Sequence, residues 1–253
     1  MLKRLAILLF SAAIGLGFST AQASSSACPH LFEASQAPNL ASSVSAKVTV
    51  VCYTDYALAN SGVTKGPLWS AEHLTKEQVA LAKNVTRKDA FHADKNVPAA
   101  DRAELADYKG SGYDRGHMTP SGDAPSADSQ YETFTLANIV PQNSTLNRGK
   151  WSRIEASVRA MATEMDELYV ITGPIFDADS IPTIGDNRVA VPKYVWKAVS
   201  FPNGGGAGAY RCTNAAPVTC DVVSIQVITD ATGVTIFPDL SQYDRQHPID
   251  LPL

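Results

Sequence analysis

The sequence has no excess of basic residues. Its 253 residues contain 21 Lys and Arg against 25 Asp and Glu, which gives a formal net charge of −4. The chain as a whole therefore does not attract a polyanion, and any site for one must be a local cluster of cations. Arg148, Lys150, Arg153 and Arg159, set against the single acidic Glu155, form one candidate cluster.

Several sequence signatures of familiar sites are also missing. No Gly-x-Ser-x-Gly elbow occurs, which argues against a serine esterase. The glycine run 204–206 is not followed by Lys-Ser/Thr, so it is a flexible turn and not a phosphate loop. Neither a CxxC nor an HxxxH spacing is present, which argues against structural zinc.

A long apolar run occurs at the N-terminus. Lys3 and Arg4 precede residues 5–18, and Ala21-Gln22-Ala23 offers a cleavage site before Ser24. This pattern predicts a secretory signal peptide over 1–23, and the run is short for a transmembrane anchor. We expect a periplasmic or extracellular protein of residues 24–253, with a formal charge of −6 and no membrane attachment after cleavage.

Four cysteines follow the expected cleavage site, which fits an oxidising compartment. Cys212 and Cys220 flank a short Pro-containing segment and are expected to close a local loop, which leaves Cys28 to pair with Cys52. Four cysteines allow three connectivities, and the sequence does not decide among them. Two disulfides are favoured over a structural metal ion bound by these cysteines.

The composition, with 45% hydrophobic and 18% charged residues, is that of a globular protein. We expect one domain over 24–253 with an irregular N-terminal arm over 24–45. Strands are predicted at 47–53, 114–118, 134–140, 169–172, 189–200 and 222–228. Pro141 is expected to end the strand at 134–140, and Gly173-Pro174 the strand at 169–172. Residues 119–131 are expected to form a long loop.

A periodic segment follows the strand predicted at 134–140. Trp151, Ile154, Val158, Met161, Met165 and Leu168 recur at steps of three and four, which predicts a helix with one apolar stripe. Ser144 or Thr145 is expected to cap it. Asn147, Glu155 and Arg159 fall on neighbouring rows of the same helix.

Polar residues of several chemical types gather between Tyr113 and Arg159. An imidazole, His117, could take a proton near neutral pH, and the Asn147 carboxamide suits a hard divalent cation. A guanidinium such as Arg159 can stabilise charge on a phosphate. A lone histidine is more often structural, and a lone asparagine near a helix start is more often a cap. The combination nevertheless indicates phosphodiester hydrolysis.

Taken together, these residues resemble the DNA/RNA non-specific endonucleases of the ββα-metal superfamily, in their secreted, Serratia-type form. The resemblance is carried by Asp-Arg-Gly-His at 114–117 and continues through Asn138, Gln142, Asn147, Trp151, Glu155 and Arg159. It extends back to Arg87, Phe91 and 67–69 and forward to 169–176, covering roughly residues 45 to 235. It implies an α+β fold, in which helices flank a central antiparallel sheet that carries a ββα-metal motif.

The resemblance also implies roles for individual residues. His117, oriented by an acceptor on its other ring nitrogen, is the expected general base, and Arg87 and Arg159 offset charge at phosphorus. One Mg²⁺, or Mn²⁺ or another divalent cation, is expected on Asn147, with Glu155 reaching it through water. Supporting residues are Asp114, Arg115, Asn138 and Gln142. Four other histidines, His30, His73, His92 and His247, are left out of the chemistry.

The implied activity is hydrolysis of single- and double-stranded DNA and RNA to 5′-phosphate products. A protein inhibitor or immunity protein and a homodimer are compatible with the resemblance. Two alternatives share the same residues: a secreted binding protein that has lost catalysis, and a toxin delivered with an immunity partner. The first would be expected to lack His117, Asn147 or Arg159, and all three are present.

Overall fold

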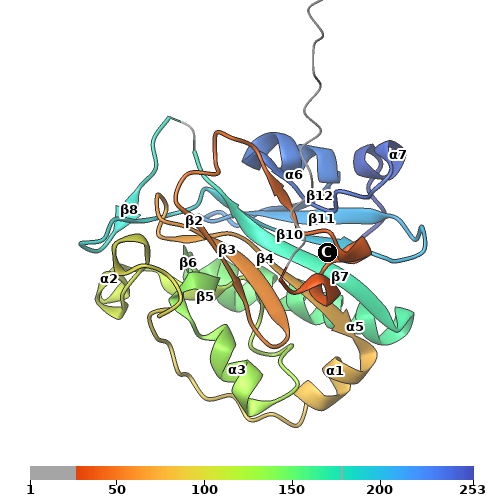
Figure 1. Cartoon of the computed structure of the whole chain (residues 1–253), viewed down its shortest axis with the longest axis horizontal. Coiled ribbons are helices and arrows are strands. Elements are labelled where there is room, and N and C mark those ends of the chain that lie inside the picture. Colours follow the sequence, from red (N-terminus) through yellow and green to blue (C-terminus); the bar gives the residue numbers. More distant parts are fainter. Residues whose placement is uncertain (1–26, 178) are drawn as a thin grey trace, which may run out of the picture.

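The computed structural model describes residues 27–177 and 179–253, so the expected signal peptide lies outside the described residues. At its centre is a seven-stranded antiparallel sheet with the order β12-β11-β10-β7-β4-β3-β2 (Figure 1). Its strands are β2 (Val48–Cys52), β3 (Tyr56–Ser61), β4 (Gly66–Thr75), β7 (Glu167–Ile175), β10 (Tyr194–Ser200), β11 (Ala207–Thr213) and β12 (Cys220–Val223).

Both faces of this sheet are buried. Side chains alternate between the faces along a strand, so Val170 of β7 packs on one side and Ile171 on the other. Helices α1 (Lys76–Ala82) and α5 (Ser152–Met165) cover the first side. The N-terminal arm and α6 (Ile225–Thr232) cover the second (Figure 1). Of the described helices, none is both long enough and apolar enough to cross a membrane.

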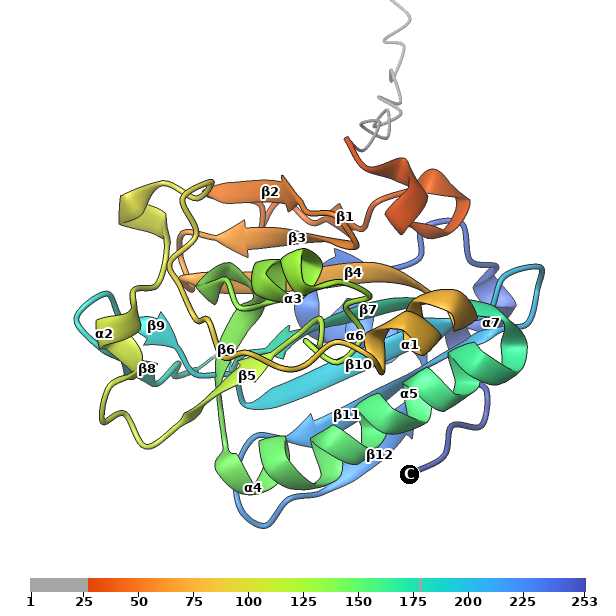
Figure 2. The ribbon, with the colours of Figure 1, turned by 90° about the horizontal axis from the view of Figure 1, so that it is seen from below.

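A smaller unit carries the polar motif. Strands β5 (Asp114–His117) and β6 (Ile139–Gln142) form a separate antiparallel pair in which His117 lies opposite Ile139. After β6 come α4 (Ser144–Leu146), a π-helical turn over Asn147–Trp151, and then α5, which runs along the sheet (Figure 2). The expected α+β class, central antiparallel sheet and ββα motif are confirmed.

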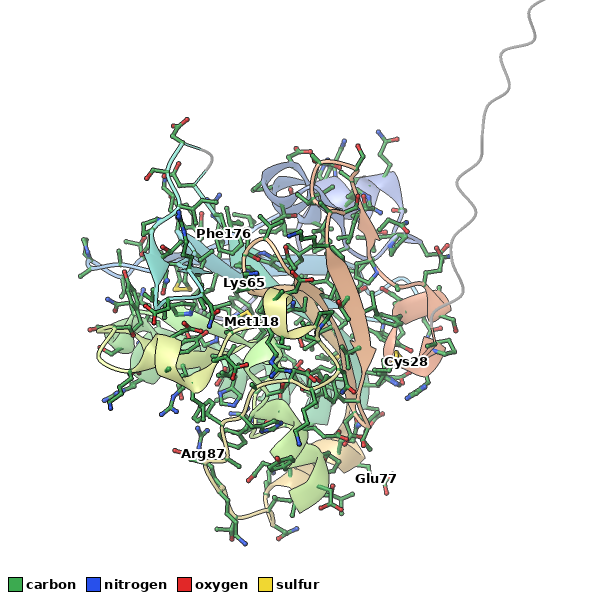
Figure 3. The ribbon with its side chains drawn as sticks, turned by 60° about the vertical axis from the view of Figure 1, so that its left-hand side comes forward. Cys28, Lys65, Glu77, Arg87, Met118 and Phe176 are labelled. Carbon is green, nitrogen blue, oxygen red and sulfur yellow. A yellow bond between two sulfur atoms is a disulfide. The ribbon has the colours of Figure 1, made fainter. Side chains whose placement is uncertain are left out.

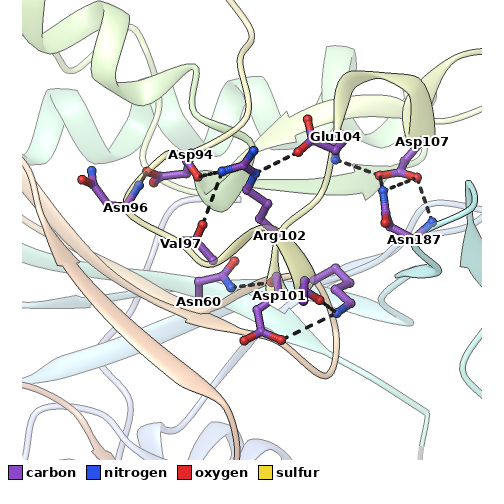
Figure 4. Close-up of polar contacts among 11 residues, drawn as sticks. Asn60, Asp94, Asn96, Val97, Asp101, Arg102, Glu104, Asp107 and Asn187 are labelled. Atoms are coloured by element: carbon purple, nitrogen blue, oxygen red, sulfur yellow. Dashed lines mark hydrogen bonds and ion pairs between the residues drawn. The ribbon is translucent and has the colours of Figure 1, made fainter.

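The chain entering β5 is held by polar contacts (Figure 4). Arg102 donates to the Glu104 carboxylate (2.8 Å) and to the carbonyl oxygen of Asp94 (3.1 Å). Asp107, in α2 (Leu105–Tyr108), accepts hydrogen bonds from Asn187. These bonds tie three separate segments together, so β5 starts from a fixed position. Shorter elements are β1 (Asn39–Leu40), β8 (Thr183–Ile184), β9 (Val189–Ala190), β13 (Val234–Thr235) and α7 (Gln242–Gln246).

The predicted loop over 119–131 and the predicted strand over 134–140 are both partly wrong. Helix α3 (Ala127–Thr133) begins inside the loop, and Ser126 caps it by accepting from the Ser129 N–H. A 3₁₀ turn over Leu136–Asn138 then delays the strand until residue 139. The sequence signal is weak because the cap lacks the usual glutamate or glutamine three residues later.

Neither proline ends its strand as predicted. Pro141 lies inside β6 and Pro174 lies inside β7. Proline is tolerated where its missing N–H faces an unpaired edge. Strand β6 pairs only with β5, and β7 beyond Thr172 pairs only with β10, so both prolines have such an edge.

The predicted helix and last strand also need correction. Asn143, and not Ser144 or Thr145, caps the helix by accepting from two backbone N–H groups. The apolar stripe is shorter than predicted, since Met165 is 55% exposed and Leu168 belongs to β7. The predicted strand over 222–228 is mostly helix, because Ser224 caps α6.

Both expected disulfides are present. Cys28–Cys52 joins the N-terminal arm to β2, and Cys212–Cys220 joins β11 to β12. These pairings leave no cysteine among the described residues for a zinc ion.

Candidate active site

A cavity of about 540 Å³ opens between β5, α5 and the segment that follows α1. Seven residues with a predicted catalytic, metal-binding or supporting role line it: Arg87, Asp114, Arg115, His117, Asn147, Glu155 and Arg159. Arg87 comes from the extended segment at the lower edge of the molecule in Figure 3. Asn138 and Gln142 do not line the cavity, because both are fully buried behind it.

His117 ends β5 and is almost fully buried, at 7% exposed. Its ring packs against Phe91 and Phe134, with centroids 5.4 and 4.9 Å away. Nε2 has no hydrogen-bond partner within the described part of the chain, so packing orients the ring in place of the expected acceptor. Burial lowers the His117 pKa to about 3, and the cations Arg87 and Arg115 act in the same direction against Asp89. The imidazole is therefore neutral near pH 7 and able to accept a proton.

Gly116 is required by the pairing of β5 with β6. A Cβ at this position would lie 2.0 Å from Gln142 Oε1 and 2.5 Å from Gln142 Cβ. Both contacts are far below van der Waals distance, and the Gln142 side chain is fully buried. Asn138 holds the next turn, since it accepts from the Thr119 N–H (3.0 Å) and donates to the Thr119 and Thr133 carbonyls.

Asn147 begins the π-helical turn before α5 and lines the cavity. Its Nδ2 donates to Asp114 Oδ2 (3.0 Å), which fixes the amide and leaves Oδ1 as an acceptor. Arg148 holds the same carboxylate with two bonds of 2.8 and 2.7 Å, and these bonds lower the Asp114 pKa. An oriented amide oxygen suits a hard divalent cation, so the residues present fit the expected metal.

Glu155 lies eight residues further along the helix and is half-buried in the same cavity. Burial raises its pKa to about 7; Lys197 and Arg159 oppose this shift and Asp123 adds to it. The carboxylate is thus short of compensating positive charge, which a bound cation would supply. This is a second feature that fits a metal site.

Arg159 is held by a residue that sequence reasoning missed. Its Nη1 donates to Asp123 Oδ1 (2.7 Å), and the Asp123 side chain is only 3% exposed. Behind this pair lie Glu72 and Lys197, both fully buried. Burial raises the pKa of Glu72, and Asp123 raises it further against Lys197 and Arg159. The ion pair gives the guanidinium a fixed position beside the cavity.

The sequence alone gives little indication that Asp123 and Lys197 lie beside Arg159. Asp123 falls in a stretch predicted as loop, and Lys197 lies in an apolar strand, where it donates to the Met118 carbonyl (3.1 Å) and to Thr172 Oγ1 (2.7 Å). A charged residue within a buried strand is the one available clue, because lysine is almost never fully buried without partners.

We expect Asp123→Asn to destabilise the protein by about 2 kcal/mol and to lower kcat about tenfold, with a smaller change in KM. Breaking a buried ion pair costs more than breaking an exposed one, and the Arg159 guanidinium would lose the contact that fixes its position beside the cavity. Urea unfolding and steady-state cleavage measure the two effects. Asp221→Asn is the control, because Asp221 pairs with Arg211 on the surface and should cost under about 1 kcal/mol. Equal effects from the two variants would contradict the assignment.

The predicted basic cluster is more balanced than the sequence indicated. Arg148 and Arg159 each pair with a carboxylate, Asp114 and Asp123 respectively. Arg87 is likewise paired with Asp89 Oδ1 (2.8 Å) and also donates to Ser121 Oγ (2.8 Å). Arg115, which lies over the Phe91 ring (4.1 Å), adds positive charge at the cavity.

The chain is similar to known nucleases. The family model described as DNA/RNA non-specific endonuclease matches residues 34–242. Nuclease C1 of Cunninghamella echinulata var. echinulata is 35% identical over 198 residues, which are 68% of this chain and 76% of that protein. Bovine mitochondrial endonuclease G is 33% identical over 73% of this chain and 68% of its own length.

Two further comparisons concern the length of the relatives and the fold. Human mitochondrial nuclease EXOG is 32% identical over 76% of this chain, but the chain covers only 57% of that protein. A solved structure of the EndoG/EndoGI complex, concerned with the mechanism of EndoG inhibition, superposes with a TM-score of 0.67 at 28% identity, covering 77% of this chain and 88% of that chain.

Proposed function

The chain belongs to the DNA/RNA non-specific endonuclease family, a family of divalent-metal-dependent nucleases, and from this premise we propose that it hydrolyses phosphodiester bonds in both DNA and RNA. The observation that carries the proposal is that one cavity holds neutral His117, the Asn147 amide oxygen and the Arg159 guanidinium. Each supplies a different requirement of phosphoryl transfer to water.

The residues divide the work as follows. His117 takes a proton from the attacking water, since its ring is neutral at working pH. Arg87 and Arg159 offset the negative charge that develops on the phosphate oxygens. Asp114, held by Arg148, orients the Asn147 amide, while Arg115 lines the approach to the site.

Asn147 would hold Mg²⁺ directly and Glu155 would reach it through water, with Mn²⁺ as a substitute. A divalent cation bound there supplies charge stabilisation as a Lewis acid. None of these protein groups needs a ribose 2′-hydroxyl, so we propose that both sugars are accepted. We further propose that the products carry 5′-phosphate ends.

The test is digestion of plasmid DNA and of RNA by the oxidised protein of residues 24–253, with Mg²⁺ and with EDTA. We expect cleavage of both polymers with Mg²⁺, none with EDTA, and 5′ ends that a kinase labels only after phosphatase treatment. Absence of cleavage by a folded protein with both disulfides formed would favour a binding protein that has kept the fold.

The raised pKa of Glu155 predicts how metal binding depends on pH. A carboxyl with a pKa of about 7 loses its charge as the pH falls through 7, so affinity for Mg²⁺ should drop by up to about tenfold between pH 8 and pH 6. The same shift makes the metal-free protein more stable at pH 6 than at pH 8, because the folded state binds that proton more tightly. Titration calorimetry without nucleic acid measures the affinity.

Glu155→Gln is the matched variant for this pH dependence. It should bind Mg²⁺ more weakly and with an affinity that no longer changes between pH 8 and pH 6. His117 contributes nothing in this range, because its pKa lies near 3. A pH dependence that survives in Glu155→Gln would assign the effect to another group.

We also propose export through cleavage before Ser24, supported by the N-terminal sequence pattern, to the periplasm or the medium. N-terminal sequencing of the protein from its host would settle this, with Ser24 as the expected first residue. An inhibitor protein is a further proposal, supported by the solved complex of EndoG with its inhibitor.

A further inference from the structure

A second hollow of about 520 Å³ lies beside the catalytic cavity. The two share Val85 and Gln130 as wall residues, so they are adjacent. We refer to this space as the side hollow. Its lining residues come from the segment after α1 and from α3, and those used below are Lys88, Asp128, Gln130 and Tyr131.

Tyr131 is the feature that needs an explanation. It lies on α3, its side chain belongs to the side hollow, and it is 53% exposed. One face of its ring is covered by His92, with centroids 4.4 Å apart and planes within 6°. His92 is itself fixed by a 2.8 Å hydrogen bond between Nδ1 and the Ala90 carbonyl. A supported, half-exposed aromatic ring therefore borders an open space.

The side hollow is rigidly connected to the catalytic residues. Gln130 Oε1 accepts from the Lys88 N–H (2.9 Å), which ties α3 to the segment before β5. The preceding residue, Arg87, donates to Ser121 Oγ (2.8 Å) inside the catalytic cavity. Arg87 and Lys88 are adjacent in one segment and line the catalytic cavity and the side hollow respectively, so the distance between the two spaces is fixed.

Resting on the proposed function, we propose that the side hollow is a subsite for an unpaired nucleobase close to the phosphate being cut, with the base stacked on Tyr131. Every base has a flat π-face, so an aromatic platform binds bases with little regard to sequence. A base in a duplex stays stacked on its neighbours and is costly to unstack. The side hollow therefore favours single-stranded DNA and RNA over duplexes.

The side hollow contains one basic and one acidic side chain, so substitutions at the two positions should change nucleic-acid affinity in opposite directions. Lys88 can meet a backbone phosphate, whereas Asp128 repels one. Lys88→Gln should weaken binding and reduce the slope of log K against log salt by about 0.7, the value for one phosphate contact in a single strand. Asp128→Asn should strengthen binding.

The decisive variant is Tyr131→Ala in the chain of residues 24–253. Binding to a fluorescent single-stranded oligonucleotide is measured by anisotropy in EDTA, and KM for single strand and duplex is measured with Mg²⁺. We expect single-strand binding to weaken and the single-strand KM to rise by about 5- to 150-fold, the range for losing one base–aromatic stack. The duplex KM should change less than twofold, and Tyr131→Phe should behave as wild type.

Tyr243→Ala is the matched control, because Tyr243 is also exposed and stacked on a histidine, His247, with centroids 4.1 Å apart. It lies on α7, on the opposite side of the sheet from α3 (Figure 1). Unchanged single-strand binding in Tyr131→Ala, or equal losses for single strand and duplex, would overturn the subsite. A wild-type protein that binds single strands but cuts nothing would defeat the proposed function alone, since the anisotropy comparison still tests the subsite.

Discussion

His117→Ala is expected to lower the rate of DNA and RNA cleavage by at least about 10²- to 10⁴-fold, the usual contribution of a general base. The ring is neutral because burial and the nearby cations Arg87 and Arg115 disfavour its charged form. No other histidine lines the catalytic cavity among the described residues, so none can replace it. Initial rates at saturating substrate and Mg²⁺ measure the loss.

Folding must be checked because the ring is packed between Phe91 and Phe134. Truncating it leaves a cavity that costs roughly 2 to 4 kcal/mol, so thermal unfolding is recorded alongside. His117→Gln keeps more of the volume without supplying the base and should be as inactive. His247→Ala removes an exposed histidine and should leave cleavage unchanged. Near-normal cleavage by folded His117→Ala would refute the role.

Asn147→Ala should reduce cleavage at least about 100-fold at millimolar Mg²⁺ and should weaken Mg²⁺ binding in the absence of nucleic acid. Mutating a residue that only hydrogen-bonds a metal ligand lowers metal affinity or activity by about 10- to 100-fold. Asn147 is the proposed direct ligand, so its loss should cost at least as much. Its amide is fixed by Asp114, so the oxygen is oriented before the cation arrives. Titration calorimetry gives the affinity independently of activity.

The Asn147→Asp variant distinguishes the role of the side-chain oxygen as a metal ligand from the role of the hydrogen bond to Asp114 that orients it. It keeps an oxygen but replaces the N–H donor with a carboxylate facing Asp114, and two like charges repel. We expect partial recovery relative to alanine, and only at high Mg²⁺. Asn96→Ala, at an exposed asparagine outside the cavity, should match wild type. Unchanged Mg²⁺ affinity in Asn147→Ala would rule out Asn147 as the ligand.

Much of the site could be predicted because its residues lie in recognisable local patterns. The Asp-Arg-Gly-His stretch and the helix after Asn143 carry most of them within 46 residues, from position 114 to 159. Helical spacing fixes which residues share a side, and Glu155 and Arg159 do share one side of α5. Asn147 lines the same cavity, although a π-helical turn with a non-helical Gly149 separates it from α5. Arg87 came only from the family resemblance, since an arginine in a loop has no periodic signal.

Elements without a strong pattern were not found in the sequence. Strand β3 has the sequence Tyr-Ala-Leu-Ala-Asn-Ser and is buried at every position, so it shows neither alternation nor a β-branched run. The sequence predicts strand ends at Pro141 and Pro174, although each occupies an edge that only the assembled sheet defines. Such errors follow from tertiary context overriding local propensity.

The sequence by itself determined the chemistry that is available: a histidine beside a glycine, an amide and a carboxylate eight residues apart, and four cysteines whose pairing it left open. Only the tertiary structure decided the environment of those groups. Burial of the ring, which packs against Phe91 and Phe134, lowers the His117 pKa, and the nearby cations lower it further. The ion pair with Asp123 fixes the position of the Arg159 guanidinium. Electrostatic free energies depend on burial and on distances of a few ångströms, and sequence spacing does not specify these for residues brought together by the sheet.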